Sequence, residues 1–492
     1  MPPADLTSWP LRDPARGRRN LNALTSHLGA DQLAALLSAL GRLLSRVADP
    51  DMALNNLERL LAQPAAREQL PELLDARGRG LEAILQLLAT SQFFADTLAA
   101  YPEAIESVRG PTRRSPSTAE LTAQLQSDVN AAIDDVGVLR ALRRFRQLQM
   151  LRVGVNDIVR DRLLEEVTRD LARVADACVE VTLQVALRNL TKRYGQPTAA
   201  DGTPARVAAL AFGKLGGDEL NYSSDVDLMF VYDHDGQTTG RRVDGVPNEE
   251  FFAKLVSEVV RLLSAHTDRG LAYRIDLRLR PGGSRGPLVR SVAGTLSYYD
   301  AMGRTWERQA LIKLRPVAGD IALGREFVAA VEPFVYRKYF SFSEINEVKA
   351  LKRRMEHRTT AAGADDLDVK TGRGGIRDIE YTVQFLQLLN GGDLPAVRQR
   401  NTLTALEALE IAGCLTAQET YILADAYRFL RKTEHRLQLL FDWQTHALPT
   451  TAEELRKLAR RMGYAESNPS PKRGGEEELS PPPLLGEGEK AL

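Results

Sequence analysis

Residues 207–232 read VAALAFGKLGGDELNYSSDVDLMFVY, and this stretch constrains the fold more than any other part of the chain. An apolar run over 207–212 predicts a buried strand, and a turn rich in glycine, Gly213 to Gly217, follows it. The alternation and the β-branched and aromatic residues from Asp225 to Tyr232 predict a second strand. The stretch therefore predicts the start of a mixed α/β unit.

The second predicted strand begins with two acidic residues. Residues i and i+2 of a strand point to the same face, so Asp225 and Asp227 should present two adjacent carboxylates. Adjacent carboxylates repel each other unless a cation lies between them, and Mg²⁺ prefers hard oxygen ligands together with substrate phosphates. The upstream glycines would let backbone N–H groups approach a polyphosphate. This layout favours nucleotidyl transfer.

A third carboxylate is predicted from residues 271–281, which read LAYRIDLRLRP. We expect a strand there, with Arg274, Asp276, Arg278 and Arg280 on one face. Asp276 would complete a metal-binding triad, and Arg278 and Arg280 would hold phosphate oxygens through their forked donors. The alternative is a solvated strand face. The order of glycine turn, Asp-x-Asp strand and Asp/Arg strand favours the site.

Three motifs carry a resemblance to a known family: FGKLGGDELNYSSDVDL at 212–228, IDLRLRP at 275–281 and KTGRGGIRDIE at 370–380. Together they resemble the glutamine synthetase adenylyltransferase/adenylyl-removing enzymes, whose long chains carry two catalytic units of the DNA polymerase β type. The sequence NYSS at residues 221–224 is similar to the corresponding segment of the N-terminal, adenylyl-removing unit. The resemblance runs from about the first helices to Tyr464.

The resemblance implies a reaction and a set of site residues. Inorganic phosphate would attack the AMP phosphorus of an adenylylated tyrosine on glutamine synthetase, giving ADP. The catalytic residues and Mg²⁺ ligands would be Asp225, Asp227 and Asp276. The nucleotide-binding candidates are Gly213, Lys214, Gly216, Gly217, Ser224, Arg278 and Arg280, and the phosphate or substrate candidates are Lys370, Arg373 and Arg377.

The other partners implied by the resemblance are ATP or ADP and a PII-type signal protein. Two alternatives stay open. The same metal site would serve an adenylyltransferase that attaches AMP from ATP to glutamine synthetase, and the chain could also be a non-catalytic binding module.

The expected fold class is α+β and mostly α-helical, with the nucleotidyltransferase-type domain between two helical regions. We expect an N-terminal helical region over 1–190, the catalytic domain over 191–320, a helical domain over 321–465 and a disordered tail over 466–492. Family chains would continue into a second catalytic unit, so we expect a truncated chain.

The composition limits the classes of binding partner and the cellular compartment that the sequence favours. Lys plus Arg and Asp plus Glu number 65 each in 492 residues, so the zero net charge does not favour nucleic acid or an anionic membrane. The first 20 residues lack the apolar core of a signal peptide, and Cys178 and Cys414 lie far apart. The sequence therefore predicts a cytoplasmic protein.

Overall fold

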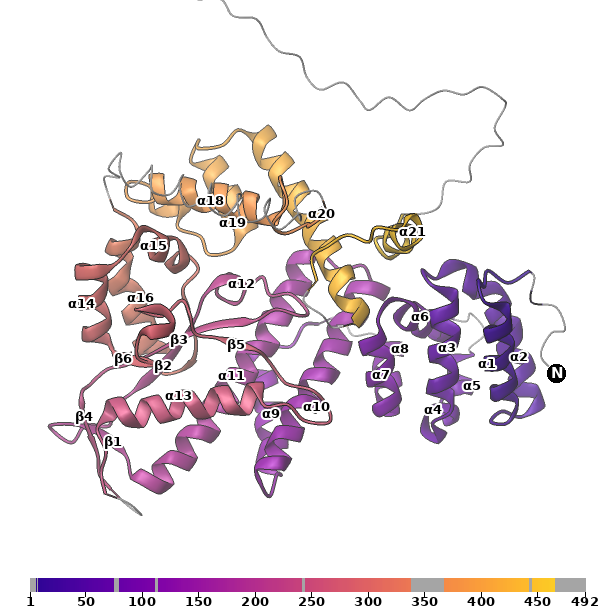
Figure 1. Ribbon diagram of the computed structural model, residues 1–492, viewed down its shortest axis with the longest axis horizontal. Coiled ribbons are helices and arrows are strands. Elements are labelled where there is room, and N and C mark those ends of the chain that lie inside the picture. Colours follow the sequence, from indigo (N-terminus) through magenta and orange to yellow (C-terminus); the bar gives the residue numbers. More distant parts are fainter. Residues whose placement is uncertain are drawn as a thin grey trace, which may run out of the picture.

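The computed structural model describes residues 6, 8–74, 79–110, 114–240, 244–337, 367–441 and 445–464. In this part of the chain a small sheet lies between an N-terminal and a C-terminal group of helices (Figure 1). The arrangement confirms the predicted fold class, α+β and mostly helical. The predicted tail over 466–492 lies outside the described residues.

The N-terminal group consists of helices with leucine-rich buried faces. Their starts follow local rules: Asp49 accepts a hydrogen bond from the N–H of Met52, and Pro50 occupies the first helical position of α3. The helices are α1 (Pro14–Thr25), α2 (Ala30–Leu43), η1 (Leu44–Arg46), α3 (Pro50–Leu61), α4 (Pro64–Glu68), α5 (Leu70–Leu73), α6 (Arg79–Thr90), α7 (Gln92–Ala100), η2 (Pro102–Ala104), α8 (Ile105–Arg109), α9 (Thr118–Asn130), α10 (Asp135–Gly154), the π-helical turn η3 (Val155–Val159) and α11 (Leu164–Tyr194).

The main sheet is built around the two strands of the glycine-turn stretch. Strand β2 (Val207–Ala211) pairs antiparallel with β3 (Val226–Tyr232) and with β7 (Arg315–Gly319). The other edge of β3 pairs in parallel first with β5 (Ile275–Asp276) and then with β6 (Val289–Ser291). A separate ribbon is formed by β1 (Pro197–Ala199) and β4 (Gly236–Thr238).

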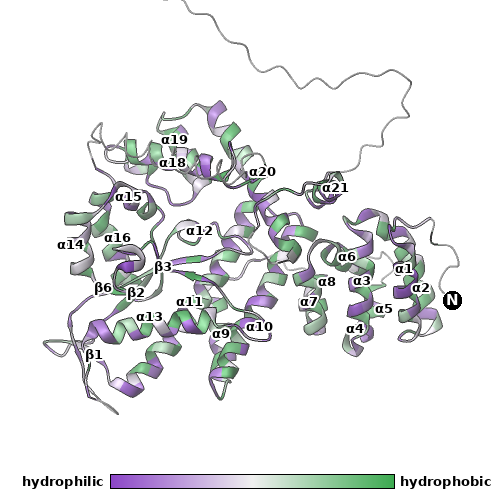
Figure 2. Ribbon diagram, viewed as in Figure 1, coloured by the Kyte–Doolittle hydropathy of each residue, from purple (hydrophilic) through white to green (hydrophobic). Residues whose placement is uncertain are grey.

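Helices cover both faces of this sheet, so β2 is buried along its whole length. Ala209 and Phe230 belong to the core that includes α11 and α13 (Asn248–Ser264), whereas Leu210 and Met229 pack in the core that includes α14 (Val292–Met302) and α16 (Ile321–Val335). The strands β2 and β3 are accordingly apolar, while the surrounding helices alternate between polar and apolar surface (Figure 2). Asp227 is two residues before Met229 and therefore shares the face toward α14 and α16.

The predicted strand over 271–281 is much shorter in the structure, which corrects the expectation of four polar side chains along one strand face. Only Ile275 and Asp276 pair with β3, opposite Val226 and Asp227. The chain then turns, because β6 occupies the next part of the same edge of β3 and leaves no partner for a longer β5. The turn continues through η4 (Gly283–Arg285).

The C-terminal group lies across one end of the main sheet (Figure 1). It contains α18 (Ile376–Asn390), η5 (Pro395–Val397), α19 (Thr402–Ile411), α20 (Ala417–Phe441) and α21 (Ala452–Arg461). Helix α11 crosses the predicted boundary at residue 190 and joins the core of the sheet, so the division into domains stays a prediction. Among the described residues, no helix is long and apolar enough to span a membrane.

Candidate functional site

A cleft of about 290 Å³ lies at the start of β3, between the main sheet and the C-terminal helices. The one-turn helix α12 (Gly213–Gly216) forms part of its rim. Many predicted site residues line it, although they come from segments that are far apart in sequence. They are Gly213, Lys214, Ser224, Asp225, Asp227, Asp276, Arg278 and Lys370.

Three carboxylates define the chemistry of the cleft. Asp227 and Asp276 are direct partners across the parallel pairing of β3 and β5, and Asp225 precedes Asp227 by two residues. Burial, reinforced by the negative charges of Asp276 and Asp225, raises the pKa of Asp227 to about 7. Such a group of acids is stable only if a proton or a cation neutralises part of its charge.

Two of these carboxylates are held by arginines. Arg274 donates from Nε to Oδ1 of Asp225 at 2.7 Å, and Arg278 donates from Nε to Oδ1 and Oδ2 of Asp276 at 3.0 and 2.8 Å. Despite partial burial, the hydrogen bonds from Arg278 lower the pKa of Asp276. In the described part of the chain, no three acidic, histidine or cysteine side chains converge as a metal-binding group. The carboxylate oxygens of Asp225, Asp227 and Asp276, which line one cleft, are nevertheless the donor type that a hard divalent cation prefers.

Lys214 lies in the cleft wall as a buried cation. Its Nζ is 3.0 and 3.1 Å from the two carboxylate oxygens of Glu434 on α20. Burial lowers the pKa of Lys214 to about 8, although the charge of Glu434 opposes this shift. Glu434 also lies 2.9 Å from Nδ1 of His446, which lines the same cleft.

The predicted phosphate-cradling glycines have different positions. Gly213 has a left-handed φ of 54°, and a Cβ on it would lie 2.6 Å from Oδ2 of Asp227. A Cβ on Gly216 would lie 2.0 Å from the carbonyl oxygen of Lys313, and one on Gly217 would lie 3.1 Å from that of Arg400. Gly216 and Gly217 are thus required for backbone packing, and neither lines the cleft.

Arg280 also differs from expectation. It is buried, and its guanidinium donates to the backbone carbonyls of Leu277, Gly286 and Pro287 at 2.7, 2.9 and 2.9 Å. These bonds stabilise the turn after β5. The structure therefore places Arg280 behind the site, whereas Arg278 lies at the cleft with a side chain that is 76% exposed.

The glycine turn at 372–375 immediately precedes the first turn of α18. Its N–H groups are already bonded within the chain: that of Gly374 donates to Asp378, that of Ile376 to Val369 and that of Arg377 to Lys370. These donors are therefore not available to phosphate, contrary to what the glycine turn suggests. Lys370 lines the cleft, Arg377 lines an adjoining apolar cavity, and Arg373 is exposed outside the cleft lining.

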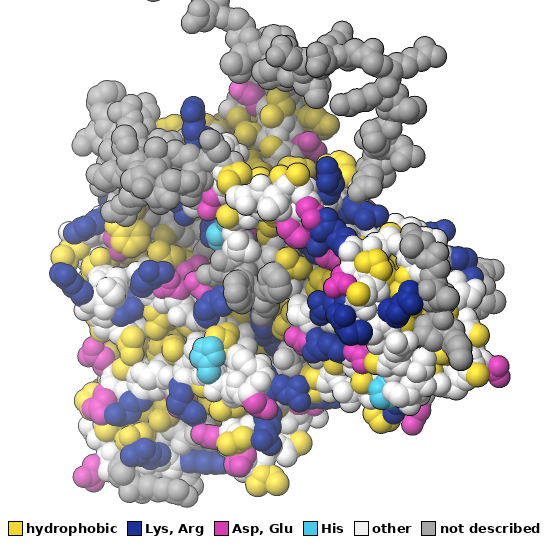
Figure 3. Space-filling model, turned by 45° about the vertical axis from the view of Figure 1, so that its right-hand side comes forward, with side chains coloured by type: hydrophobic (Ala, Val, Ile, Leu, Met, Phe, Trp, Pro, Cys, Tyr) yellow, Lys and Arg dark blue, Asp and Glu magenta, His cyan; other side chains and the backbone are white. Residues whose placement is uncertain are grey.

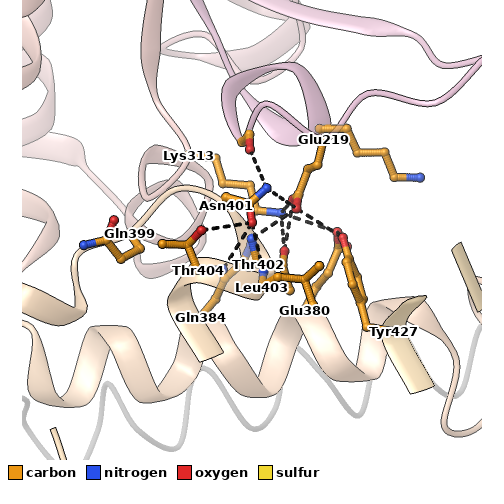
Figure 4. Close-up of polar contacts among 12 residues, drawn as sticks. Glu219, Lys313, Glu380, Gln384, Gln399, Asn401, Thr402, Leu403, Thr404 and Tyr427 are labelled. Carbon is orange, nitrogen blue, oxygen red and sulfur yellow. Dashed lines mark hydrogen bonds and ion pairs between the residues drawn. The ribbon is translucent and has the colours of Figure 1, made fainter. Parts of the chain in front are cut away.

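A buried polar network behind the cleft connects the sheet to the C-terminal helices (Figure 4). Lys313, just before β7, pairs with Glu219 and Glu380 and donates to the hydroxyl of Thr402 at 3.2 Å. Glu219 also accepts from the N–H of Thr402 at 3.1 Å and from the hydroxyl of Tyr427 at 3.2 Å. Because its members come from α18, α19, α20 and the loop before β3, the network fixes these segments relative to one another.

Several cleft residues were not predicted from the sequence. They are Ser223, Lys313, Glu380, Gln384, Gln438 and His446. Glu380 ends the motif at 370–380, so it could have been noticed there. Lys313 has no spacing signal, because β7 brings it to the site only by pairing with β2 about a hundred residues earlier.

Comparisons with known proteins place this chain among related sequences. A family described as Glutamate-ammonia ligase adenylyltransferase matches residues 81–330, and one described as GlnD PII-uridylyltransferase matches residues 346–476.

Individual relatives carry the name bifunctional glutamine synthetase adenylyltransferase/adenylyl-removing enzyme. The one from Hahella chejuensis is 37% identical over 401 residues, covering 80% of this chain and 41% of the relative. Those from Pseudomonas aeruginosa and Xanthomonas campestris pv. campestris are each 39% identical, covering 73% and 78% of this chain and 36% and 40% of the relative. The chain thus spans about two fifths of the length of the curated relatives it matches.

Proposed function

We propose a function for this chain, which belongs to the glutamate-ammonia ligase adenylyltransferase family. It removes AMP from an adenylylated tyrosine of glutamine synthetase. The reaction is a phosphorolysis that yields ADP and the unmodified tyrosine. The relatives named above are called bifunctional, with an adenylyltransferase and an adenylyl-removing activity.

One observation carries the chemical part of this proposal. The in-register pair of Asp227 and Asp276, with Asp225 two residues away, forms a concentrated anionic site beside two cleft lysines, Lys214 and Lys370. Carboxylates that bind a divalent cation, next to cations that bind phosphate oxygens, are what in-line transfer at phosphorus requires.

The proposed step is a single displacement. An oxygen of inorganic phosphate attacks the AMP phosphorus, the bond from phosphorus to the tyrosine oxygen breaks, and the tyrosine oxygen takes up a proton. Mg²⁺ held by Asp225, Asp227 and Asp276 would neutralise charge on the attacking and leaving oxygens. Lys214 and Arg278 orient the phosphate groups, and Glu434 holds the Lys214 ammonium at the cleft wall.

The proposal that the chain removes AMP, and does not attach it, rests on the sequence NYSS at residues 221–224. Asn221 is buried and accepts a hydrogen bond from Arg431, and its Oδ1 lies 3.1 Å from Nε2 of His435, so it anchors the loop that leads to Ser223 and Ser224. The N–H of Ser223 donates to Gln438 at 3.2 Å. The contacts of Asn221 and Ser223 therefore depend on the residue types at these positions. These are the positions at which the resemblance distinguishes the adenylyl-removing unit from the transferase unit.

The decisive experiment incubates the purified chain with adenylylated glutamine synthetase, Mg²⁺ and phosphate and follows ADP release. Phosphate-dependent ADP release that Asp227→Asn abolishes is the expected result. A parallel reaction contains labelled ATP, unmodified glutamine synthetase and glutamine. Efficient label transfer there, without phosphate-dependent ADP release in the first reaction, would assign the site to adenylyl attachment instead.

A further inference from the structure

A second polar cavity, of about 340 Å³, lies away from the cleft between the N-terminal helices and α20–α21. We call it the basic cavity, because its lining contains five cationic side chains: Arg46, Lys432, Arg436, Arg460 and Arg461. The one acidic residue of this lining is Asp161. Figure 3 brings the N-terminal helices forward and shows Lys and Arg side chains gathered beside them.

Existing contacts account for only part of this positive charge. Arg436 is held by Asp157 at 2.7 and 2.8 Å, and Lys432 lies 3.0 Å from Asp161. Three arginines retain donors. Arg46 has a 64% exposed side chain and one long contact of 3.4 Å to Glu82, and Arg460 donates from Nη2 to the carbonyl of Ser45 at 3.0 Å.

Arg461 is the most informative of the three. Its Nε is buried and has no hydrogen-bond partner in the described part of the chain. Burial lowers the pKa of Arg461. A buried guanidinium nitrogen without a partner is costly, and an anionic ligand in the cavity would satisfy it.

We propose that the basic cavity binds a small polyanion of the phosphate class, with two or three linked phosphate groups. Forked guanidinium donors match phosphate oxygens in pairs, and three arginines that surround one space favour a ligand with several such groups. The volume lies near the lower end of the range for small-molecule sites, roughly 300–1,000 Å³, so it suits a compact ligand.

Helix α20 connects this cavity to the cleft. Lys432 and Arg436 face the basic cavity, whereas Glu434 and Gln438, offset by two residues, face the cleft on the opposite side of the helix. The partner of Arg436, Asp157, also accepts from the hydroxyl of Tyr222 at 3.0 Å. An anion bound here thus contacts a helix and a hydrogen-bonded chain that both reach the cleft.

Calorimetric titration with tripolyphosphate tests the proposal, in buffer with EDTA so that neither metal nor turnover contributes. The intact chain should bind one equivalent. Arg46→Gln and Arg461→Gln should each weaken binding by about tenfold, the cost of one charged hydrogen-bonding partner. The matched control is Arg428→Gln, which removes an exposed arginine of α20 that pairs with Glu165 at 2.7 Å and should bind as tightly as the intact chain.

Four outcomes would overturn the proposal. Absence of binding by the intact chain would do so, and so would equal weakening by Arg428→Gln, because the interaction would then be non-specific. Loss of binding in Lys370→Gln alone would locate the anion in the cleft. Citrate, titrated in parallel, separates the chemical classes: binding as tight as that of tripolyphosphate would contradict a phosphate site. Thermal melting confirms that each variant is folded, and failure of the phosphorolysis assay would not affect any of these results.

Discussion

Asp227 and Asp276 stand opposite each other in register on two parallel strands, although they are 49 positions apart in the sequence. The pairing holds the carboxylates on one face of the sheet without any loop to adjust their separation. Burial is the main cause of the raised pKa of Asp227, and the repulsion that the strand geometry maintains adds to it.

Replacement of Asp227 by asparagine should stabilise the metal-free protein at neutral and higher pH. The folded-state pKa of about 7 exceeds the unfolded value of about 3.9, so the folded state binds more protons between these limits and loses stability as pH rises through them. Asp227→Asn should be more stable than the original chain above pH 7, by on the order of 2 kcal/mol after allowance for partial exposure.

Urea unfolding in EDTA from pH 4 to 8 measures this difference, which should vanish near pH 4. Asp244→Asn, at an exposed position, is the matched control and should show no such trend. Added Mg²⁺ should stabilise the original chain more than Asp227→Asn. A constant difference in stability at every pH would contradict the raised pKa of Asp227.

Activity should depend on all three carboxylates. Asp225→Asn, Asp227→Asn and Asp276→Asn should each reduce phosphate-dependent ADP release by about a hundredfold or more, because each removes a charge from the proposed cation site. The Mg²⁺ concentration needed for half-maximal rate should rise in any variant with residual activity. Near-normal rates at limiting Mg²⁺ would exclude the tested residue from the metal site.

The buried pair of Glu219 and Lys313 should be important for stability. Glu219→Gln leaves the Lys313 ammonium without its main countercharge and should destabilise the fold by about 3 kcal/mol. The double variant Glu219→Gln/Lys313→Met should be less destabilised than the sum of the single variants, since it leaves no isolated buried cation. Glu407→Gln, on an exposed part of α19, is the control, and additive effects in chemical denaturation would argue against coupling.

Gly216 should tolerate alanine poorly. A Cβ there would meet two backbone carbonyls, of Lys313 at 2.0 Å and of Ala211 at 2.7 Å, and neither can move without disturbing the sheet. Gly216→Ala should therefore cost about 3 kcal/mol or prevent folding. The comparison is Gly202→Ala, whose left-handed φ of 85° costs about 1–2 kcal/mol but whose Cβ meets open space. Equal melting temperatures would contradict the close packing.

The two strands of the opening stretch could be predicted because their signals are local. An apolar run, a glycine turn and alternating residues after Asp225 determine β2, β3 and the shared face of Asp225 and Asp227. The motif order also led to Asp276, and the comparisons confirm the family resemblance drawn from it. The roles assigned to the individual site residues stay predictions.

The rest depends on contacts between distant segments. The length of β5 could not be predicted from its alternating residues, because it is limited by β6 on the same edge of β3. Arg280 looked like a phosphate ligand, yet the turn that follows β5 takes up its donors. Lys313 has no sequence signal, and Glu219, although it lies in the motif at 212–228, could not be identified from the sequence as its partner, because only the fold brings the two together.

The network around Glu219 also restricts the movement of one flank of the cleft. Glu219 and Lys313 have side chains only 3% and 6% exposed, and separating them would bring two charges out of a fully bonded interior. The network therefore holds α18 and α19 rigidly against the sheet. In the proposed reaction, the adenylylated tyrosine would enter beside Ser224 and Arg278, which line the cleft, Arg278 with an exposed side chain.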